Sequence, residues 1–171
     1  PCNPTGQVIK DEAMDRYIEA ARKENCLLGA DEFYATFSYN EDGSPAEKAV
    51  SALPYVKDIN RDPVIVFDGL TKGFRYPGWR AGWAIGPKYL IEMINRAASA
   101  VDGGPSTMVQ RGVIEELAEG HAEAELLATR KEFAVKRKMM MEGLAELGIH
   151  TPANQPLGTF YLWASIENLP G

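Results

Sequence analysis

The chain contains 171 residues, of which 45% are hydrophobic and 25% are charged, and its formal net charge at pH 7 is −6. This balance is typical of a folded globular domain and excludes a disordered segment, and the negative net charge argues against a nucleic-acid-binding surface. No apolar run approaches the length of a membrane-spanning helix, and the N-terminus has no signal-peptide pattern, so we expect no membrane partner.

The first third of the chain predicts a turn, a helix and a strand in succession. Residues 3–6, Asn-Pro-Thr-Gly, have the residue types of a β-turn. Acidic residues open a predicted helix at Asp11, because negative charge stabilises a helix N-terminus. The apolar run from Cys26 to Ala30 predicts a buried strand that ends at Asp31. The polar residues 38–63 predict a long connection with room for one short helix.

Apolar patterning predicts the remaining elements. The predicted strands are Val64–Phe67 and Ala81–Ile85, and the predicted helices cover residues 87–100, 105–119 and 123–147. Residues 159–164 predict the first strand of a second domain. A cluster of basic residues on the last helix predicts a solvated face; it consists of Arg130, Lys131, Lys136, Arg137 and Lys138.

The cysteine and histidine residues indicate the redox environment of the protein and whether it binds a metal. Cys2 and Cys26 do not make a disulfide framework, which indicates a reducing, cytoplasmic environment. His121 and His150 are far apart in the sequence and show no metal-ligand spacing, so we expect no metal site. The first residue is a proline rather than methionine, which indicates a piece of a longer protein.

The most informative stretch runs from Asp68 to Trp83 and carries Lys72 and Arg80 on a glycine-punctuated loop. Desolvation lowers the pKa of an amine and makes it a nucleophile that can form an imine with a carbonyl. A guanidinium offers a planar fork that matches a phosphate. The two side chains together suit an aldehyde that carries a phosphate, such as pyridoxal phosphate. Taken alone, the pair fits a solvated lysine and a surface arginine better.

Four motifs occur in a fixed order along the chain: Asn3-Pro-Thr-Gly6, Asp31-Glu-Phe-Tyr34, Thr71-Lys72 and Arg80-Ala-Gly82. In this order and spacing the chain resembles the class I/II aminotransferases, which are pyridoxal-phosphate enzymes of fold type I, over nearly its whole length. The resemblance implies an α/β fold, namely the three-layer α/β/α large domain of such a transferase followed by the start of a smaller α+β C-terminal domain. Residues 1–120 would form the C-terminal half of the cofactor-binding large domain. Residues 121–171 would form the long interdomain helix and the start of the small domain.

The resemblance also implies the roles of the two charged residues that would touch the reacting part of the cofactor. Lys72 would hold pyridoxal 5'-phosphate as an internal aldimine and, once displaced, would move a proton between the substrate Cα and the cofactor C4′. Asp31 would keep the pyridine nitrogen protonated, which makes the ring an electron sink. Without the resemblance, Asp31 would be interpreted as a helix cap.

The remaining implied contacts hold the ring oxygen and the phosphate. Tyr34 and Asn3 would donate hydrogen bonds to the phenolic oxygen of the ring, although Tyr34 alone would be interpreted as a packed aromatic. Arg80 would bind the phosphate, with the Thr71 hydroxyl as a second contact. The chain departs from the family at Gly69, where many members carry a serine that also binds the phosphate.

These roles favour amino-group transfer between an amino acid and a 2-oxo acid, in a homodimer with shared active sites. Two alternatives stay open. A β-eliminating carbon–sulfur lyase or a related fold type I enzyme would use the same lysine, and the cofactor-sensing domain of a transcription regulator would use the same contacts. The family's phosphate loop, the aromatic that stacks on the ring and the arginine that binds the substrate carboxylate cannot be placed in this chain.

Overall fold

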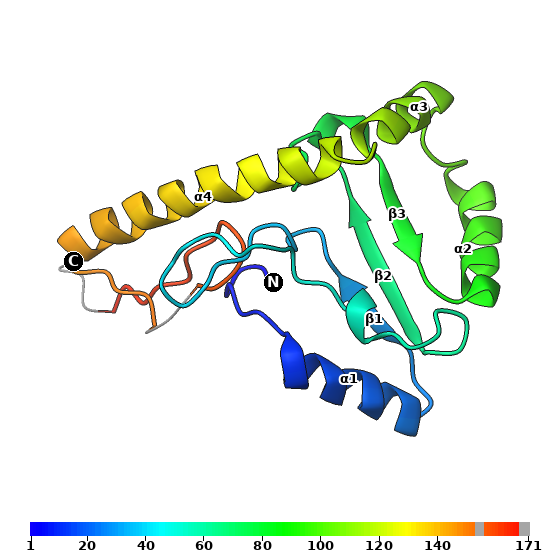
Figure 1. The fold of residues 1–171 in the computed structure, drawn as a ribbon, viewed down its shortest axis with the longest axis horizontal. Coiled ribbons are helices and arrows are strands. Elements are labelled where there is room, and N and C mark those ends of the chain that lie inside the picture. Colours follow the sequence, from blue (N-terminus) through cyan, green and yellow to red (C-terminus); the bar gives the residue numbers. More distant parts are fainter. Residues whose placement is uncertain (153–155, 168–171) are drawn as a thin grey trace. The chain divides into compact units, whose positions relative to one another are not determined.

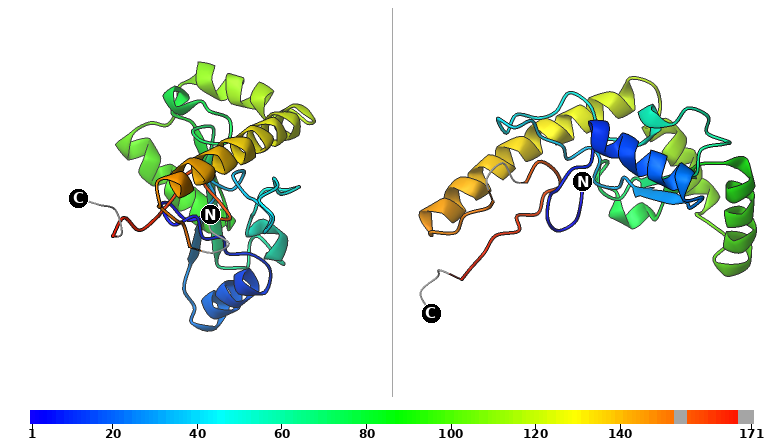
Figure 2. Two further views of the ribbon diagram at one scale, coloured as in Figure 1. Left: turned by 90° about the vertical axis from the view of Figure 1, so that its left-hand side faces the viewer. Right: turned by 90° about the horizontal axis from the view of Figure 1, so that it is seen from below.

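The computed structural model describes residues 1–152 and 156–167 (Figures 1 and 2). Its contacts divide the chain into two compact units. Ile9–Phe33 and Ser51–Ala122 form one unit, here called the sheet unit. Pro1–Val8, Tyr34–Val50 and Glu123–Gly171 form the other, here called the aromatic unit.

A three-stranded sheet with the order β1-β2-β3 forms the centre of the sheet unit (Figure 1). β1 (Leu28–Asp31) runs parallel to β2 (Val64–Gly69), and β3 (Gly82–Ile85) runs antiparallel to β2. The register pairs Asp31 with Phe67 and Gly69 with Gly82. The ends of β1 and β2 and the start of β3 therefore lie at one edge of the sheet, which is the edge where an α/β sheet gathers ligand-binding groups.

The sheet unit also contains three α-helices, and each begins close to its predicted position. They are α1 (Asp11–Lys23), α2 (Lys88–Val101) and α3 (Thr107–Glu116). α1 begins with two acidic residues, and the side chain of Ser106 caps α3 by accepting the Val109 N–H. The short helix expected in the long connection is the 3-10 helix η1 (Leu53–Tyr55). The buried core joins α1, this connection and β2 through Ile18, Ala52, Val64 and Val66.

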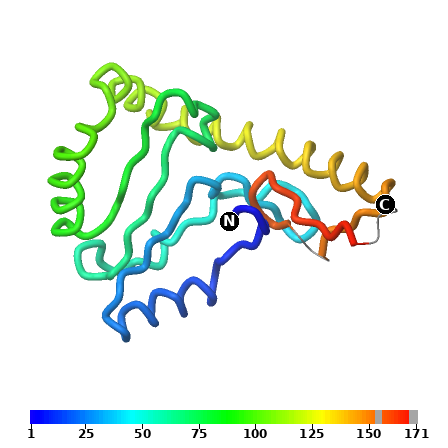
Figure 3. The backbone as a smooth tube through the Cα atoms, turned by 180° about the vertical axis from the view of Figure 1, so that it is seen from behind, coloured from blue at the N-terminus to red at the C-terminus, as the bar shows by residue number. Residues whose placement is uncertain are grey.

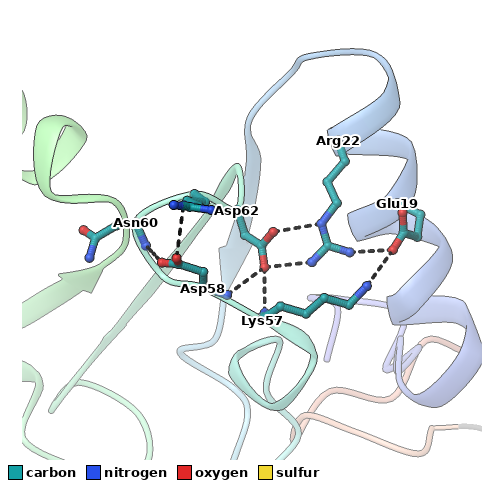
Figure 4. A network of polar contacts seen from close by, with 7 residues as sticks. Glu19, Arg22, Lys57, Asp58, Asn60 and Asp62 are labelled. Atoms are coloured by element: carbon teal, nitrogen blue, oxygen red, sulfur yellow. Dashed lines mark hydrogen bonds and ion pairs between the residues drawn. The ribbon is translucent and has the colours of Figure 1, made fainter.

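An ion network ties α1 to the loop that precedes β2 (Figure 4). Arg22 donates from Nε and Nη2 to the two carboxylate oxygens of Asp62 at 2.8 and 2.7 Å, and from Nη1 to Glu19 at 2.6 Å. Asp62 also accepts the backbone N–H of Lys57 at 2.6 Å. The hydrogen bond from Arg22 is the main cause that holds the pKa of Asp62 far below its usual range.

The aromatic unit contains most of the long helix α4 (His121–Glu146), which Figure 2 shows as one continuous helix. Its core is a group of rings rather than a sheet. Phe37 is 1% exposed, and its ring centroid lies 4.8 Å from that of Phe133 and 5.0 Å from that of Phe160. Edge-to-face contacts of this kind add to the hydrophobic stabilisation of buried rings.

Two segments far apart in the sequence lie side by side in this unit, as the tube in Figure 3 shows for the cyan loop and the orange-red C-terminal segment. The Tyr39 N–H donates to the Leu157 carbonyl at 2.9 Å, and the Thr159 N–H donates to the Phe37 carbonyl at 2.8 Å. An isolated bridge joins Ser38 and Gly158.

The strand predicted for residues 159–164 is wrong, because the described part of this segment contains no strand. Thr159 has a φ of 64°, which is the left-handed region that a strand cannot continue through. The rings of Phe160 and Tyr161 pack instead against the ring of Tyr34, at centroid distances of 5.4 and 5.7 Å.

The prediction of a solvated basic face on α4 is wrong for Arg130. This side chain is only 5% exposed, and its Nε and Nη1 have no hydrogen-bond partner among the described residues. Burial lowers the pKa of Arg130. Lys131, Lys136 and Lys138 are exposed as expected, whereas Arg137 is half-buried and donates from Nε to the Pro156 carbonyl at 2.8 Å. The difference arises because Arg130 lies on the same face as the buried Ala134, four residues or one helical turn further on.

Membrane-spanning helices and metal-binding clusters are both absent from the described residues. Within residues 1–152 and 156–167, no helix is both long and apolar enough to cross a membrane. The same residues contain no group of three or more His, Cys, Asp or Glu side chains placed to hold a metal ion.

Candidate functional site

Asp31 is the last residue of β1 and stands at the sheet edge described above. Its side chain is exposed, and its Oδ1 accepts the backbone N–H of Phe33 at 3.3 Å. The next residue, Glu32, continues the pairing with β2 through its N–H, which donates to the Phe67 carbonyl at 2.8 Å. The backbone around Asp31 is therefore fixed, and its carboxylate is exposed at the end of β1.

The loop that follows β2 holds Lys72 and is closed by backbone hydrogen bonds. The Leu70 N–H donates to the Ala81 carbonyl at 3.1 Å, and the Tyr76 N–H donates to the Leu70 carbonyl at 3.0 Å. Within the loop, the Arg75 N–H donates to the Lys72 carbonyl at 3.1 Å. Lys72 is half-buried, as is Thr71. The lysine thus sits in a tight turn that begins at the carboxyl end of a strand.

Arg80 ends this loop in a strained conformation. Its φ is 53°, and Arg75 within the same loop has a φ of 61°, so two non-glycine residues adopt the left-handed region. Such residues cost about 1–3 kcal/mol each and cluster at functional sites. The Arg80 side chain is held by a hydrogen bond from Nη1 to the Pro77 carbonyl at 3.0 Å. The rings of Tyr76 and Trp79 stack at 4.8 Å and stiffen the intervening turn.

Gly69 lies where the backbone leaves no room for a side chain. A Cβ at Gly69 would lie 2.7 Å from the Ala81 carbonyl oxygen, 2.8 Å from the Gly82 Cα and 2.9 Å from the Phe33 ring. Backbone atoms cannot retreat as a flexible side chain can, so no side chain fits here.

Asp68 is a carboxylate at this edge that sequence reasoning did not single out. Its Oδ1 accepts the Gly69 N–H at 2.7 Å. Burial raises the pKa of Asp68 to about 6, and the charges of Glu32 and Asp31 raise it further against the effect of that hydrogen bond. Asp68 could have been recognised in the sequence, because it is an acidic residue that directly follows the apolar run Val64–Phe67.

In the aromatic unit, the Tyr34 hydroxyl is the meeting point of two polar side chains. Asn3 donates from Nδ2 to the Tyr34 hydroxyl at 3.4 Å, and the hydroxyls of Tyr34 and Tyr161 lie 3.0 Å apart. Asn3 belongs to the predicted turn, which is closed by a hydrogen bond from the Gly6 N–H to the carbonyl of the preceding residue Cys2 at 2.8 Å. The peptide bond between Asn3 and Pro4 is cis. Sequence reasoning missed Tyr161, because its segment was interpreted as a strand.

The six predicted site residues thus fall into two groups. In the sheet unit, Asp31, Thr71, Lys72 and Arg80 belong to segments that leave or enter the strands at one sheet edge. In the aromatic unit, Asn3 and Tyr34 touch each other. An amine, a guanidinium and a hydroxyl on one loop, with a carboxylate at the neighbouring strand end, fit a phosphate-bearing aldehyde that also has a basic ring nitrogen.

Comparison with known proteins gives a consistent picture. The model of the family "Aminotransferase class I and II" matches residues 1–169. LL-diaminopimelate aminotransferase of Moorella thermoacetica is 32% identical, over 97% of this chain and 40% of the relative. The solved structure of an aromatic aminotransferase from Pyrococcus horikoshii matches with a TM-score of 0.82 at 26% identity, over 97% of this chain and 42% of that one. An aspartate aminotransferase double mutant of Thermus thermophilus matches with a TM-score of 0.78 at 27% identity, over 93% and 39%.

Proposed function

Since the chain belongs to the aminotransferase class I and II family, we propose that the protein is a pyridoxal-phosphate-dependent aminotransferase that moves an amino group between an amino acid and a 2-oxo acid. The family depends on this cofactor. The chain spans about 40% of the length of these relatives. The observation that carries the proposal is the lysine-bearing loop at the carboxyl end of β2, beside the Asp31 carboxylate at the end of the parallel strand β1.

The residues of the sheet unit would bind the cofactor at its two ends. Arg80 would hold the phosphate through its guanidinium, with the Thr71 hydroxyl as a second donor. Asp31 would hold a proton on the ring nitrogen. When bound, pyridoxal phosphate supplies an electron sink for the bond that breaks at the substrate Cα.

Lys72 would perform the proton transfer. Its amine would attach the cofactor through the aldehyde and, once an amino acid has taken its place, would accept a proton from the substrate Cα and deliver it to the cofactor C4′. The closed turn around Lys72 would limit the positions that the amine can reach, which favours a single route for the proton.

Asn3 and Tyr34 would orient the ring by donating hydrogen bonds to its phenolic oxygen. We also propose the domain division at residues 120/121, a large three-layer domain followed by the start of a smaller one, and a cytoplasmic homodimer with shared active sites. The named substrates of the relatives differ and include LL-diaminopimelate, aspartate and prephenate. They form a rational first panel for this protein.

The test is an acceptor-dependence assay on the complete reading frame. Purified protein loaded with pyridoxal phosphate is given LL-diaminopimelate or aspartate as the amino donor, with and without a 2-oxo acid such as prephenate as the acceptor. We expect formation of the corresponding 2-oxo acid only when the acceptor is present, together with the amino acid derived from that acceptor. Pyruvate and ammonia formed without an acceptor would instead identify a β-eliminating lyase. Cofactor binding without any turnover would favour a sensing domain.

A further inference from the structure

Gly112 lies in the interior of α3, a position where glycine is less favourable than alanine. The space around this glycine is already filled by a ring of the lysine-bearing loop. A Cβ at Gly112 would lie 2.7 Å from Cζ3 and 3.0 Å from Cη2 of Trp79. Carbon atoms in ordinary contact are about 3.5–4.0 Å apart. The indole ring therefore rests against the backbone of α3, in the place that a side chain would occupy.

The same indole is part of the ordered turn of the lysine-bearing loop. Trp79 is the last residue of the 3-10 helix η2 (Pro77–Trp79). Its ring stacks on that of Tyr76, with the centroids 4.8 Å apart and 21° between the ring planes. The Tyr76 N–H in turn donates to the carbonyl of Leu70, the residue that follows β2, at 3.0 Å. Trp79 thus connects α3 to a turn whose backbone is tied to the end of β2.

Arg80 follows Trp79 directly and depends on its position. Arg80 has a φ of 53°, and its Nη1 donates to the Pro77 carbonyl at 3.0 Å. The left-handed region allows a non-glycine residue only a narrow range of φ and ψ. Arg80 therefore has little freedom to compensate for a displaced Trp79 by rotating its own backbone. A shift of the indole would change the direction in which the guanidinium points.

We infer that Gly112 is a positioning residue, which lets Trp79 rest on α3 and through Trp79 holds Arg80 in place for the phosphate of the cofactor. The inference rests on the proposed function for the identity of the ligand. Gly112 acts through the indole and does not need to touch the cofactor. A methyl at this position would push the ring outward by about 1 Å, and a misplacement of that size weakens a geometrically demanding contact.

The variant Gly112→Ala, made in the complete protein, tests this inference with two ligands that differ only in the phosphate. We expect the dissociation constant for pyridoxal phosphate to rise about 3- to 30-fold, a partial loss of charge-assisted hydrogen bonding. The dissociation constant for pyridoxal, which has no phosphate, should stay unchanged. General damage to the site would weaken both ligands equally. Equal weakening, or no change for pyridoxal phosphate, would overturn the inference.

Gly143→Ala is the matched control, because Gly143 also lies in a helix, α4, and a Cβ there meets nothing within 4 Å. It introduces the same methyl and the same gain in helix propensity as Gly112→Ala. Both dissociation constants should match those of the wild type.

The Trp79→Phe background tests whether the methyl acts through the indole. Phenylalanine lacks the outer carbons of the indole that a Cβ at Gly112 would meet. Trp79→Phe alone should weaken the binding of pyridoxal phosphate, because the ring no longer reaches α3. Adding Gly112→Ala in this background should change the dissociation constant by less than about 2-fold, since the two changes share one contact. A further loss as large as in the Trp79 protein would contradict the inference.

Melting temperatures of the cofactor-free proteins separate this inference from the proposed function. We expect Gly112→Ala to melt about 2–6 °C below Gly143→Ala, because the crowded ring offsets the gain in helix propensity. In the Trp79→Phe background the two glycine variants should melt at the same temperature. The same difference in both backgrounds would disprove the contact between α3 and the loop. Failure of the wild type to bind pyridoxal phosphate would instead disprove the proposed function, and the melting temperatures would still decide whether the contact exists.

Discussion

The two units of the chain position their polar groups by different means. In the sheet unit the candidate residues lie at or just beyond strand ends, and the side chains of Asp31 and Arg80 form hydrogen bonds with backbone groups of their own loops. In the aromatic unit, the side chains of Asn3 and Tyr161 both contact the Tyr34 hydroxyl. The hydrogen-bonded strands of the sheet fix the Cα position of a residue. Packed rings also fix the position of the polar atoms at the tip of a side chain. We therefore expect substitutions in the sheet unit to act by removing a charge or by crowding the backbone. Substitutions in the aromatic unit should act by disrupting the packing of side chains.

The largest expected effect belongs to the lysine of the sheet unit. Lys72→Ala removes the amine that would carry the proton, so we expect turnover to fall by at least about 1000-fold. Lys88→Ala is the control, because Lys88 is an exposed lysine at the start of α2. Steady-state rates with the best substrate of the panel provide the measurement. A Lys72→Ala protein that keeps more than a tenth of the wild-type rate would contradict the proposed role.

The aromatic unit should lose most stability when its central ring is removed. Phe37→Ala deletes a ring that is 1% exposed and contacts Phe133 and Phe160, so we expect a loss of about 3–5 kcal/mol in the free energy of unfolding. Phe67→Ala in β2 removes a ring that is 37% exposed and should cost clearly less. Denaturant unfolding of both variants measures the difference. Equal losses would contradict the larger contribution expected for the buried Phe37 ring.

At position 69, we expect the lack of space for a side chain to affect stability and cofactor binding more than the lack of a hydroxyl group does. Gly69→Ser introduces the family's hydroxyl but places a Cβ 2.7 Å from the Ala81 carbonyl oxygen. We expect a loss of about 1–3 kcal/mol in stability, together with weaker cofactor binding. Gly78→Ser in the same loop is the control, because a Cβ there meets nothing within 4 Å. Tighter cofactor binding by Gly69→Ser at unchanged stability would sink this interpretation.

The ion network should stabilise the sheet unit in a pH-dependent way. Arg22→Met leaves the Asp62 carboxylate without its guanidinium partner and should cost about 1–3 kcal/mol at pH 7. Because the folded-state pKa of Asp62 is held below its unfolded value near 3.9, this stabilisation is present above about pH 4 and is lost as the pH falls further. Arg61→Met is the control, since its pair with Asp58 is highly exposed. Unfolding curves that show the same Arg22→Met penalty at pH 2 and pH 7 would contradict this role.

Asp68 should give the smallest effect and the opposite pH dependence. Its folded-state pKa of about 6 lies above the unfolded value, so folding favours the protonated form and stability is lost as the pH rises from about 4 to about 6. Asp68→Asn removes this charge and should raise the free energy of unfolding by about 1–2 kcal/mol at pH 8. Near pH 4 it should change little. Thermal unfolding at the two pH values distinguishes this outcome from a uniform effect.

The sheet unit was largely predictable because its signals are local. The apolar run before Asp68 predicts β2, and paired acidic residues predict the start of α1, which the structure confirms. The position of Asp31 at the end of one strand and that of Lys72 beyond the end of another follow from the same patterns. Their roles rest on the resemblance and the proposals above.

The aromatic unit was less predictable because long-range contacts determine it. The left-handed Thr159 removes a strand that the apolar pattern predicts, and it brings Tyr161 to Tyr34 across 127 residues. Arg130 carries a charge that normally marks a solvated face, yet it is buried on the inner face of α4. No local pattern distinguishes these residues from ordinary strand or surface positions.

The role of Lys72 is tested most directly by reduction of the cofactor-loaded complete protein with borohydride, followed by peptide mass mapping. Reduction makes a lysine–pyridoxal bond permanent, so the modified residue can be read from the peptide mass. We predict one stoichiometric pyridoxyl group on Lys72, and none in the Lys72→Ala protein. Label spread over surface lysines such as Lys88 and Lys131, with Lys72 unmodified, would contradict the central assignment.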